Sequence, residues 1–151
     1  MDEFIKDLKK FKENLKEEEK EIKRIISETM VQRIGNRMQE GLGTETWGVA
    51  SKPYKKLKDS TVKKRSKNLK LSPKTTPSTS NQIETGKMHD QLASKKKGKD
   101  YETGFFGDRA KVAKIQEDNG RATLFLNKED LEIIDDILDE QVDNLLKKTF
   151  G

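Results

Sequence analysis

Residues 82–92, QIETGKMHDQL, contain the pair of side chains in this sequence that is best suited to catalysis or metal binding. His89, the one histidine of the chain, stands next to Asp90. A histidine beside a carboxylate can serve as a general base or as a metal ligand. Adjacent residues of a helix point to different faces, however, and the chain has no cysteine that could complete a metal site. We therefore expect no catalytic residue, no metal site and no cofactor.

The same stretch has a simpler structural interpretation. Thr85 suits the N-cap of a short helix, and Gly86 eases the turn that opens it. Met88 and Leu92 are four residues apart, a spacing that places both on the inner face of that helix. No glycine-rich phosphate loop is present elsewhere, and the acidic residues near the C-terminus occupy exposed positions of an amphipathic helix. We expect that the protein is not an enzyme.

The middle of the chain, residues 41–81, is basic and rich in Gly, Ser and Thr, and it holds all three prolines. Lysines with nearby aromatic rings can follow a phosphate backbone and stack on bases, but the same composition is typical of a solvated loop. Both interpretations stay open at this point. The candidate residues for contact with a partner or with DNA are Trp47, Tyr54, Lys55, Lys56, Lys58, Lys63, Lys64, Arg65 and Lys67.

The composition predicts one domain with a small core. Of the 151 residues, 30% are hydrophobic and 39% are charged, so we expect a partner subunit to complete the buried surface. The 32 basic and 27 acidic residues leave a net charge of only +5, which is weak evidence for nucleic-acid binding. Without cysteine there is no disulfide. We see no leader peptide and no apolar stretch of the ~20 residues that a membrane span needs, so we expect a soluble protein.

The periodicity of apolar residues predicts an α+β fold. Residues 1–40 have helical spacing and end before a glycine pair, residues 41–81 form the long basic loop, with a helical turn near 59–67, and residues 82–151 form the body. In the body we expect the short helix described above, a hairpin ending near 101–107, a helix, a turn at Asn119-Gly120, a strand at 121–126 and a final helix capped by Asn127. The expected core residues are Phe105, Phe106, Phe125, Ile134 and Leu138.

The order of four short motifs, TWGVASKPYKKLKDST, QIETGKM, AKIQEDNG and RATLFL, resembles that of the phage virion-morphogenesis family, the Mu-like and P2-like tail-completion or head–tail joining proteins. The family's histidine in the third motif has no counterpart here, and Asn127 stands where the family has a glycine. The positions that carry the resemblance are Trp47, Leu57, Ser60, Thr61, Ile83, Thr85, Gly86, Met88, Ala113, Ile115, Gln116, Gly120, Arg121, Phe125 and Leu126.

The resemblance implies a non-catalytic structural subunit that forms a homo-oligomeric ring, commonly a hexamer, at the head–tail junction of the virion after assembly in the bacterial cytoplasm. Its partners would be tail-tube and head–tail connector proteins, with DNA passing through the ring and no contact with a membrane. The basic segment would then face DNA or neighbouring subunits. A basic nucleic-acid-binding accessory protein is the alternative, and it predicts tight, salt-dependent binding to DNA by the isolated chain.

Overall fold

A computed structural model describes residues 1–81, 83–118 and 121–151. The fold is α+β and mostly helical, as the sequence predicts. The elements, in chain order, are α1 (Asp2–Glu40), β1 (Leu42–Gly43), β2 (Lys52–Pro53), α2 (Asp59–Ser66), α3 (Lys87–Asp90), β3 (Leu92–Lys97), β4 (Asp100–Phe105), α4 (Ala110–Asp118) and α5 (Lys128–Phe150).

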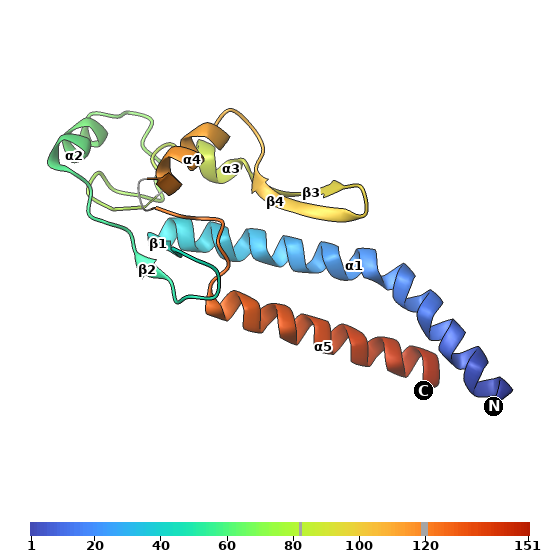
Figure 1. Ribbon diagram of the computed structural model, residues 1–151. Coiled ribbons are helices and arrows are strands. Elements are labelled where there is room, and N and C mark those ends of the chain that lie inside the picture. Colours follow the sequence, from blue (N-terminus) through green and yellow to red (C-terminus); the bar gives the residue numbers. More distant parts are fainter. Residues whose placement is uncertain (82, 119–120) are drawn as a thin grey trace.

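The long helix α1 is the axis of the molecule (Figure 1). The antiparallel hairpin β3–β4 packs on one side of α1 and α5 packs on the other, antiparallel to α1, so that both chain termini lie at the same end. The short helices α2, α3 and α4 gather at the opposite end, beside the last turns of α1 (Figure 1). The second sheet, β1–β2, consists of two residue pairs only.

The end of α1 depends on Gly41. This residue adopts a left-handed conformation (φ 73°) and its N–H bonds to the carbonyl groups of Arg37 and Met38. Glycine adopts this conformation without the steric penalty that a Cβ brings. The helix therefore stops at the glycine pair, as the sequence predicts, and the chain turns into β1.

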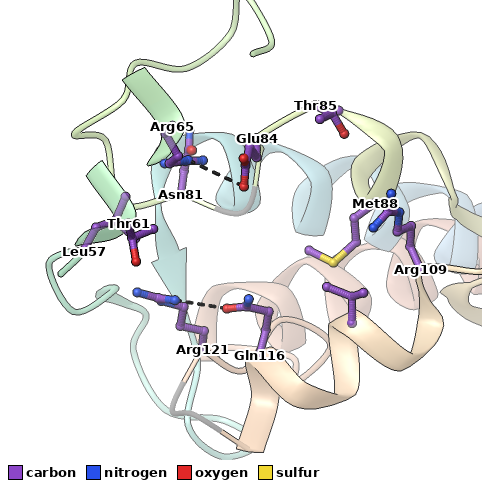
Figure 2. A pocket seen from close by; sticks show the side chains of 12 residues that line it. Leu57, Thr61, Arg65, Asn81, Glu84, Thr85, Met88, Arg109, Gln116 and Arg121 are labelled. Carbon is purple, nitrogen blue, oxygen red and sulfur yellow. Dashed lines mark hydrogen bonds and ion pairs between the residues drawn. The ribbon is translucent and has the colours of Figure 1, made fainter. Parts of the chain in front are cut away.

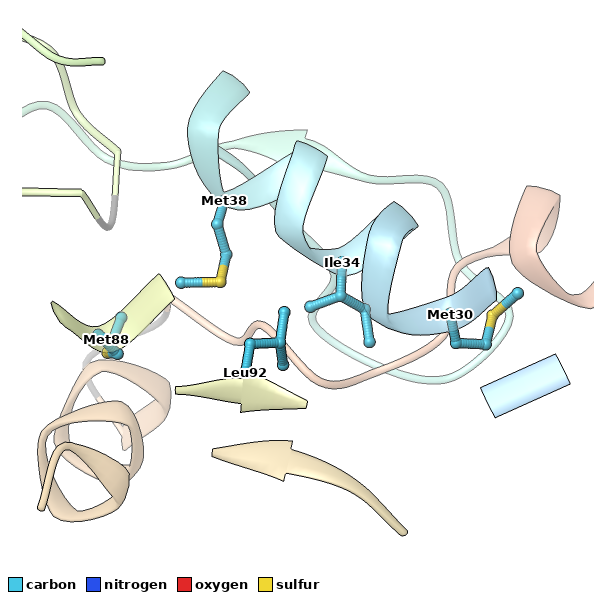
Figure 3. Close-up of a cluster of buried hydrophobic side chains, with 5 residues drawn as sticks. All are labelled: Met30, Ile34, Met38, Met88 and Leu92. Carbon is cyan, nitrogen blue, oxygen red and sulfur yellow. The ribbon is translucent and has the colours of Figure 1, made fainter. Parts of the chain in front are cut away.

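The core lies between the second half of α1 and the α3–β3 segment (Figure 3). The buried side chains of Met30, Ile34 and Met38 from α1 pack against Met88 and Leu92. This confirms the inner position predicted for Met88 and Leu92, although Leu92 begins β3 rather than continuing the helix. The N-cap of α3 is Gly86, with φ 84°, and not Thr85 as predicted.

Two of the five expected core residues, Phe105 and Ile134, do pack against this cluster. Phe106 and Phe125 are only partly buried. Leu138 is a wrong prediction, because its side chain is 39% exposed. Leu138 lies seven residues, close to two full helical turns, before the buried Leu145 of α5, so helical spacing alone does not distinguish these two positions.

The strand predicted at 121–126 is absent from the described residues of that segment. Its backbone bonds to a loop that we call the strap, residues 44–51. The Thr44 N–H donates to the Ala122 carbonyl at 3.3 Å, and the Gly48 N–H donates to the Leu126 carbonyl at 2.9 Å. These scattered bonds hold the segment extended without forming a ladder. The turn predicted at Asn119-Gly120 lies outside the described residues.

The start of α5 is fixed by a capping box. The Asn127 side chain accepts a bond from the Asp130 N–H at 2.8 Å, and the Asp130 carboxylate accepts one from the Asn127 N–H at 3.0 Å. The predicted cap at Asn127 is thus confirmed. The same carboxylate, fully buried, accepts bonds from Arg33 and Arg37 of α1, each at 2.6 Å. One carboxylate therefore joins the strap end of α5 to α1.

Candidate functional site

A cavity of about 340 Å³ at the short-helix end brings together residues from both sets that the sequence singles out. Arg65 comes from the basic segment, whereas Thr85, Gly86 and Arg121 are positions of the family resemblance. Figure 2 shows Arg65 and Glu84 on one wall, Gln116 and Arg121 on the facing wall, and Met88 with Arg109 at one end. Residues far apart in the sequence therefore form one basic pocket.

Arg65 is the most deeply placed charge of this pocket, since its side chain is only 4% exposed. Arg65 lies on α2, one helical turn after Thr61, and this spacing lets both side chains face the body. Its Nη1 donates to the Thr79 carbonyl at 2.8 Å, whereas its Nε lies 3.9 Å from Glu84, beyond hydrogen-bond distance. Burial lowers the pKa of the Arg65 guanidinium; the charge of Glu84 opposes this shift and that of Arg121 adds to it.

The two other guanidinium groups come from the segments that flank α4. Arg109 precedes the helix, and its Nε is buried without a hydrogen-bond acceptor, with an Asp108 carboxylate oxygen 4.0 Å away. Arg121 follows the helix, and its Nη1 donates to the Gln116 side chain at 3.1 Å. The pocket thus has three positive charges, with Glu84 as the acidic residue in its lining.

The remaining lining is apolar or neutral. Leu57, Met88 and Val112 supply apolar surface, and the hydroxyl groups of Thr61 and Thr85 lie at the wall. The lining includes no histidine or cysteine that could activate a hydroxyl group. The three guanidinium groups make the pocket suited to binding an anionic group.

The lysines of the basic segment do not join this pocket. All six are exposed, and no ion pair joins them to the described part of the chain: Lys55, Lys56, Lys58, Lys63, Lys64 and Lys67. Tyr54 and Arg65, by contrast, are buried in the chain itself, with 7% and 4% of their surface exposed. This corrects the prediction that groups these two residues with the exposed contact residues, because Tyr54 packs against β1 at Gly43.

Trp47 and two of the resemblance positions meet at a different place, over the start of α5. The Trp47 ring, 60% exposed, lies edge-on to Phe125 with ring centroids 6.2 Å apart. Leu126 follows and bonds the strap through its carbonyl group. Gly120 lies outside the described residues. The motif positions Thr85, Gly86 and Arg121 therefore line the pocket, whereas Phe125 and Leu126 lie at this aromatic pair.

His89 has a packing role. Its Nε2 lies 3.1 Å from the Gln39 side-chain nitrogen, and Gly35 of α1 leaves the space that the ring occupies. The Asp90 carboxylate is 3.9 Å from the other ring nitrogen and is largely exposed. Within residues 1–81, 83–118 and 121–151, no three acidic or histidine side chains are grouped so that they could hold a metal ion.

A second surface feature is what we call the arm, residues 2–20 of α1 with residues 138–150 of α5. Phe11 stacks on Phe150 at 5.9 Å, and Asn14 donates to Thr149 at 3.2 Å. Beyond this contact α1 continues past the end of α5 (Figure 1). Large apolar side chains stay exposed along the arm, and we call them the arm stripe: Phe4, Ile5, Leu8, Leu15, Leu138, Val142, Leu146 and Phe150.

Sequence reasoning missed Arg109 and Glu84 as members of the pocket. Arg109, Val112 and Gln116 are three and four residues apart, so a helical projection of residues 109–116 would have placed all three on one face. Glu84 precedes Thr85 in an irregular segment, where residue spacing predicts no direction for a side chain.

No family model, no curated protein and no solved structure matches this chain. In the described part of the chain, no helix combines the length and the apolar character that crossing a membrane requires.

Proposed function

We propose that this protein is a non-catalytic structural subunit of a phage or prophage ring that completes the tail or joins the head to the tail. The proposal is supported by the motif resemblance and by apolar surface that stays exposed in a single copy. Its partners would be further copies of the chain, in a ring that resemblance suggests is a hexamer, together with tail-tube and connector proteins. It would act in the virion, at the head–tail junction, after assembly in the host cytoplasm.

The arm stripe is the observation that carries this proposal. Phe4 is 61% exposed, and the seven other side chains of the arm stripe are 39% to 49% exposed along two packed helices. Contiguous apolar surface of this kind is uncommon on monomeric proteins and marks interaction sites. Covering it with another subunit would remove the apolar side chains from water and stabilise an assembly.

Charges beside the stripe favour a second copy as the covering partner. Lys9, Lys12 and Lys16 of α1 flank the apolar residues on one helix, whereas Asp135, Asp139 and Asp143 flank them on the other. No ion pair joins these six side chains to the described residues. In a contact between two arms, the basic edge of one copy can meet the acidic edge of the other, which gives orientation and specificity.

A complementation experiment tests the role in a phage. A phage that lacks the gene is supplied with the wild-type protein or with Val142→Glu/Leu146→Glu, and particles are counted by electron microscopy and plaque assay. We expect separate heads and tails without the protein, joined particles with the wild type, and few joined particles with the variant. Normal infective particles in the absence of the gene would contradict the proposal.

The alternative, a nucleic-acid-binding accessory protein, is favoured by one observation. The six exposed lysines from Lys55 to Lys67 form no ion pair with the residues that the structure describes. A gel-shift assay at about 50 mM and 200 mM salt tests it. If this many lysines contact phosphate groups, the increase in salt concentration over that range would weaken binding by about 10³-fold or more. Lys63→Gln/Lys64→Gln would reduce the salt dependence, and the absence of a shift at the lower salt concentration would exclude the alternative.

A further inference from the structure

Three guanidinium groups line this pocket, those of Arg65, Arg109 and Arg121. Within its lining, Glu84 is the acidic residue, and its carboxylate stays 3.9 Å from the Arg65 Nε. Asp108, at the rim, is 4.0 Å from the Arg109 Nε, and that nitrogen is buried without an acceptor. Buried donors without acceptors cost free energy that a bound oxyanion would recover.

The apolar part of the lining favours a ligand that carries a hydrocarbon group as well as an anionic group. Leu57, Met88 and Val112 provide surface for a short hydrocarbon stem, and the guanidinium groups provide paired donors for an oxyanion at its end. An aspartate or glutamate side chain combines these two features. A nucleic-acid backbone fits less well, because Arg65 is 4% exposed and lies too deep for a strand that crosses the surface.

The exposed lysines of the basic segment lie outside the pocket and differ from it in geometry. They present charge over the surface of α2 and the preceding segment, where a long anionic partner would meet them first. The pocket differs in that it is concave, has a volume of about 340 Å³ and holds guanidinium groups, which recognise a carboxylate with two parallel bonds. Lysine alone supplies no such geometry.

We propose that this pocket binds an acidic side chain of a polypeptide partner, held by the guanidinium groups of Arg65, Arg109 and Arg121 over the apolar surface of Leu57, Met88 and Val112. The proposal goes beyond the proposed function, since it names a binding site and a ligand chemistry that hold whether or not the chain acts in a virion.

The test is a titration of the full-length ¹⁵N-labelled protein with an acetylated and amidated tri-glutamate peptide, followed by NMR. The matched control peptide is tri-glutamine. We expect saturable shifts at the amides of residues 84–86 and 109–116 with tri-glutamate and none with tri-glutamine. No saturable shift up to millimolar tri-glutamate would overturn the proposal.

Two variants distinguish the contribution of the guanidinium charges to binding from that of the cavity's shape. Arg109→Gln/Arg121→Gln removes two partly exposed guanidinium groups and should weaken tri-glutamate binding by about tenfold or more. Val112→Phe keeps every charge but fills the cavity, and it should abolish the binding of tri-glutamate. Lys63→Gln/Lys64→Gln, the matched control on the exposed side of α2, should stay within about twofold of the wild type, because surface charge pairs contribute little.

Circular dichroism and thermal unfolding show that each variant remains folded. Unchanged affinity in either the arginine variant or Val112→Phe would overturn the proposal. It would also be overturned if inorganic phosphate or a single-stranded oligonucleotide shifted the same amides while tri-glutamate did not, because the pocket would then be a phosphate site.

Discussion

Asp130 is the single residue on which the pairing of α1 and α5 most depends. Its carboxylate, fully buried, accepts bonds from Arg33, Arg37 and the Asn127 N–H. Arg37 is itself 7% exposed, so removing the carboxylate would leave a buried cation without a partner. The loss of one member of a buried ion pair costs more than the pair contributes.

We therefore predict that Asp130→Ala lowers the free energy of unfolding by about 3–5 kcal/mol, as measured by urea denaturation. The control is Glu129→Gln, whose carboxylate is exposed and lies 3.5 Å from Arg33. That change should cost less than about 1 kcal/mol, because exposed pairs are screened by water. Equal losses of unfolding free energy in the two variants would show that Asp130 does not hold α5 against α1.

A second prediction compares two glycines with left-handed backbones, Gly41 (φ 73°) and Gly98 (φ 63°). An added Cβ at Gly98 meets no heavy atom within 4 Å, so Gly98→Ala should cost about 1–2 kcal/mol for its backbone conformation alone. At Gly41 the Cβ would also clash with the Ser80 carbonyl oxygen, so Gly41→Ala should cost clearly more. Urea denaturation of both variants measures the difference, and a smaller cost at Gly41 would refute it.

A third prediction concerns the ion pair that ties the hairpin to α1. Lys23 donates to Asp100 at 2.8 Å, and this bond lowers the pKa of the Asp100 carboxyl. Because the pKa is lower in the folded protein, the stabilisation is present at neutral pH and is lost as the pH falls through the folded pKa. In Lys23→Met the Asp100 pKa should rise toward its ordinary value. NMR titration measures it, and an unchanged pKa would disprove the contact.

At the scale of elements, the long helices and the hairpin were predictable because each has a local signal. Phe4, Leu8 and Leu15 follow helical spacing, and Asn127 begins a capping box whose second member is three residues away. That residues 121–126 form no strand was not predictable, because the backbone partners of this segment lie in the strap, far away in the sequence. The exposed position of Leu138 likewise depends on where α1 lies, and spacing within α5 does not specify that.

The pocket illustrates the same limit. Arg65, Thr85, Gly86 and Arg121 were each singled out from the sequence, but the prediction that they meet requires the fold. Tyr54 and Arg65 were expected among exposed contacts because their neighbours are lysines. The direction of each side chain, which no local composition encodes, decides that they are buried.

The fourth prediction concerns the uneven stability of α1. Its second half is covered on two sides, whereas its first turns project beyond α5 (Figure 1). We expect backbone amides of residues 6–10 to exchange with solvent much faster than those of residues 27–38, because local opening is easier where few contacts are buried. Hydrogen exchange measured by mass spectrometry tests this, and uniform protection along α1 would contradict it.

Phe11 should be the residue that limits this opening. Its stacking on Phe150 closes the arm, so Phe11→Ala should extend fast exchange to residues 11–20. Lys12→Ala, an exposed change that preserves helix propensity, is the matched control and should leave the exchange pattern as in the wild type.

At the scale of the whole molecule, the ends differ in chemistry. The helix α2 and the arm lie at opposite ends of the molecule (Figure 1). The arginine pocket and the exposed lysines belong to the α2 end, and the arm carries the arm stripe. A closed ring requires two different surfaces on each subunit, which meet head to tail. In the proposed ring these surfaces would be the basic edge of one arm and the acidic edge of the next, and the arginine pocket would stay open to another partner.

The most direct test of the central claim, that other copies of the chain cover the arm stripe, is sedimentation velocity over a range of protein concentrations. We predict that the wild type sediments as an assembly larger than the 17.4 kDa chain and that Val142→Glu/Leu146→Glu sediments as a monomer. The control Asp136→Ala/Glu140→Ala, on the other flank of α5, should assemble like the wild type. A wild type that sediments as a monomer at every concentration, or an arm variant that assembles normally, would contradict the claim.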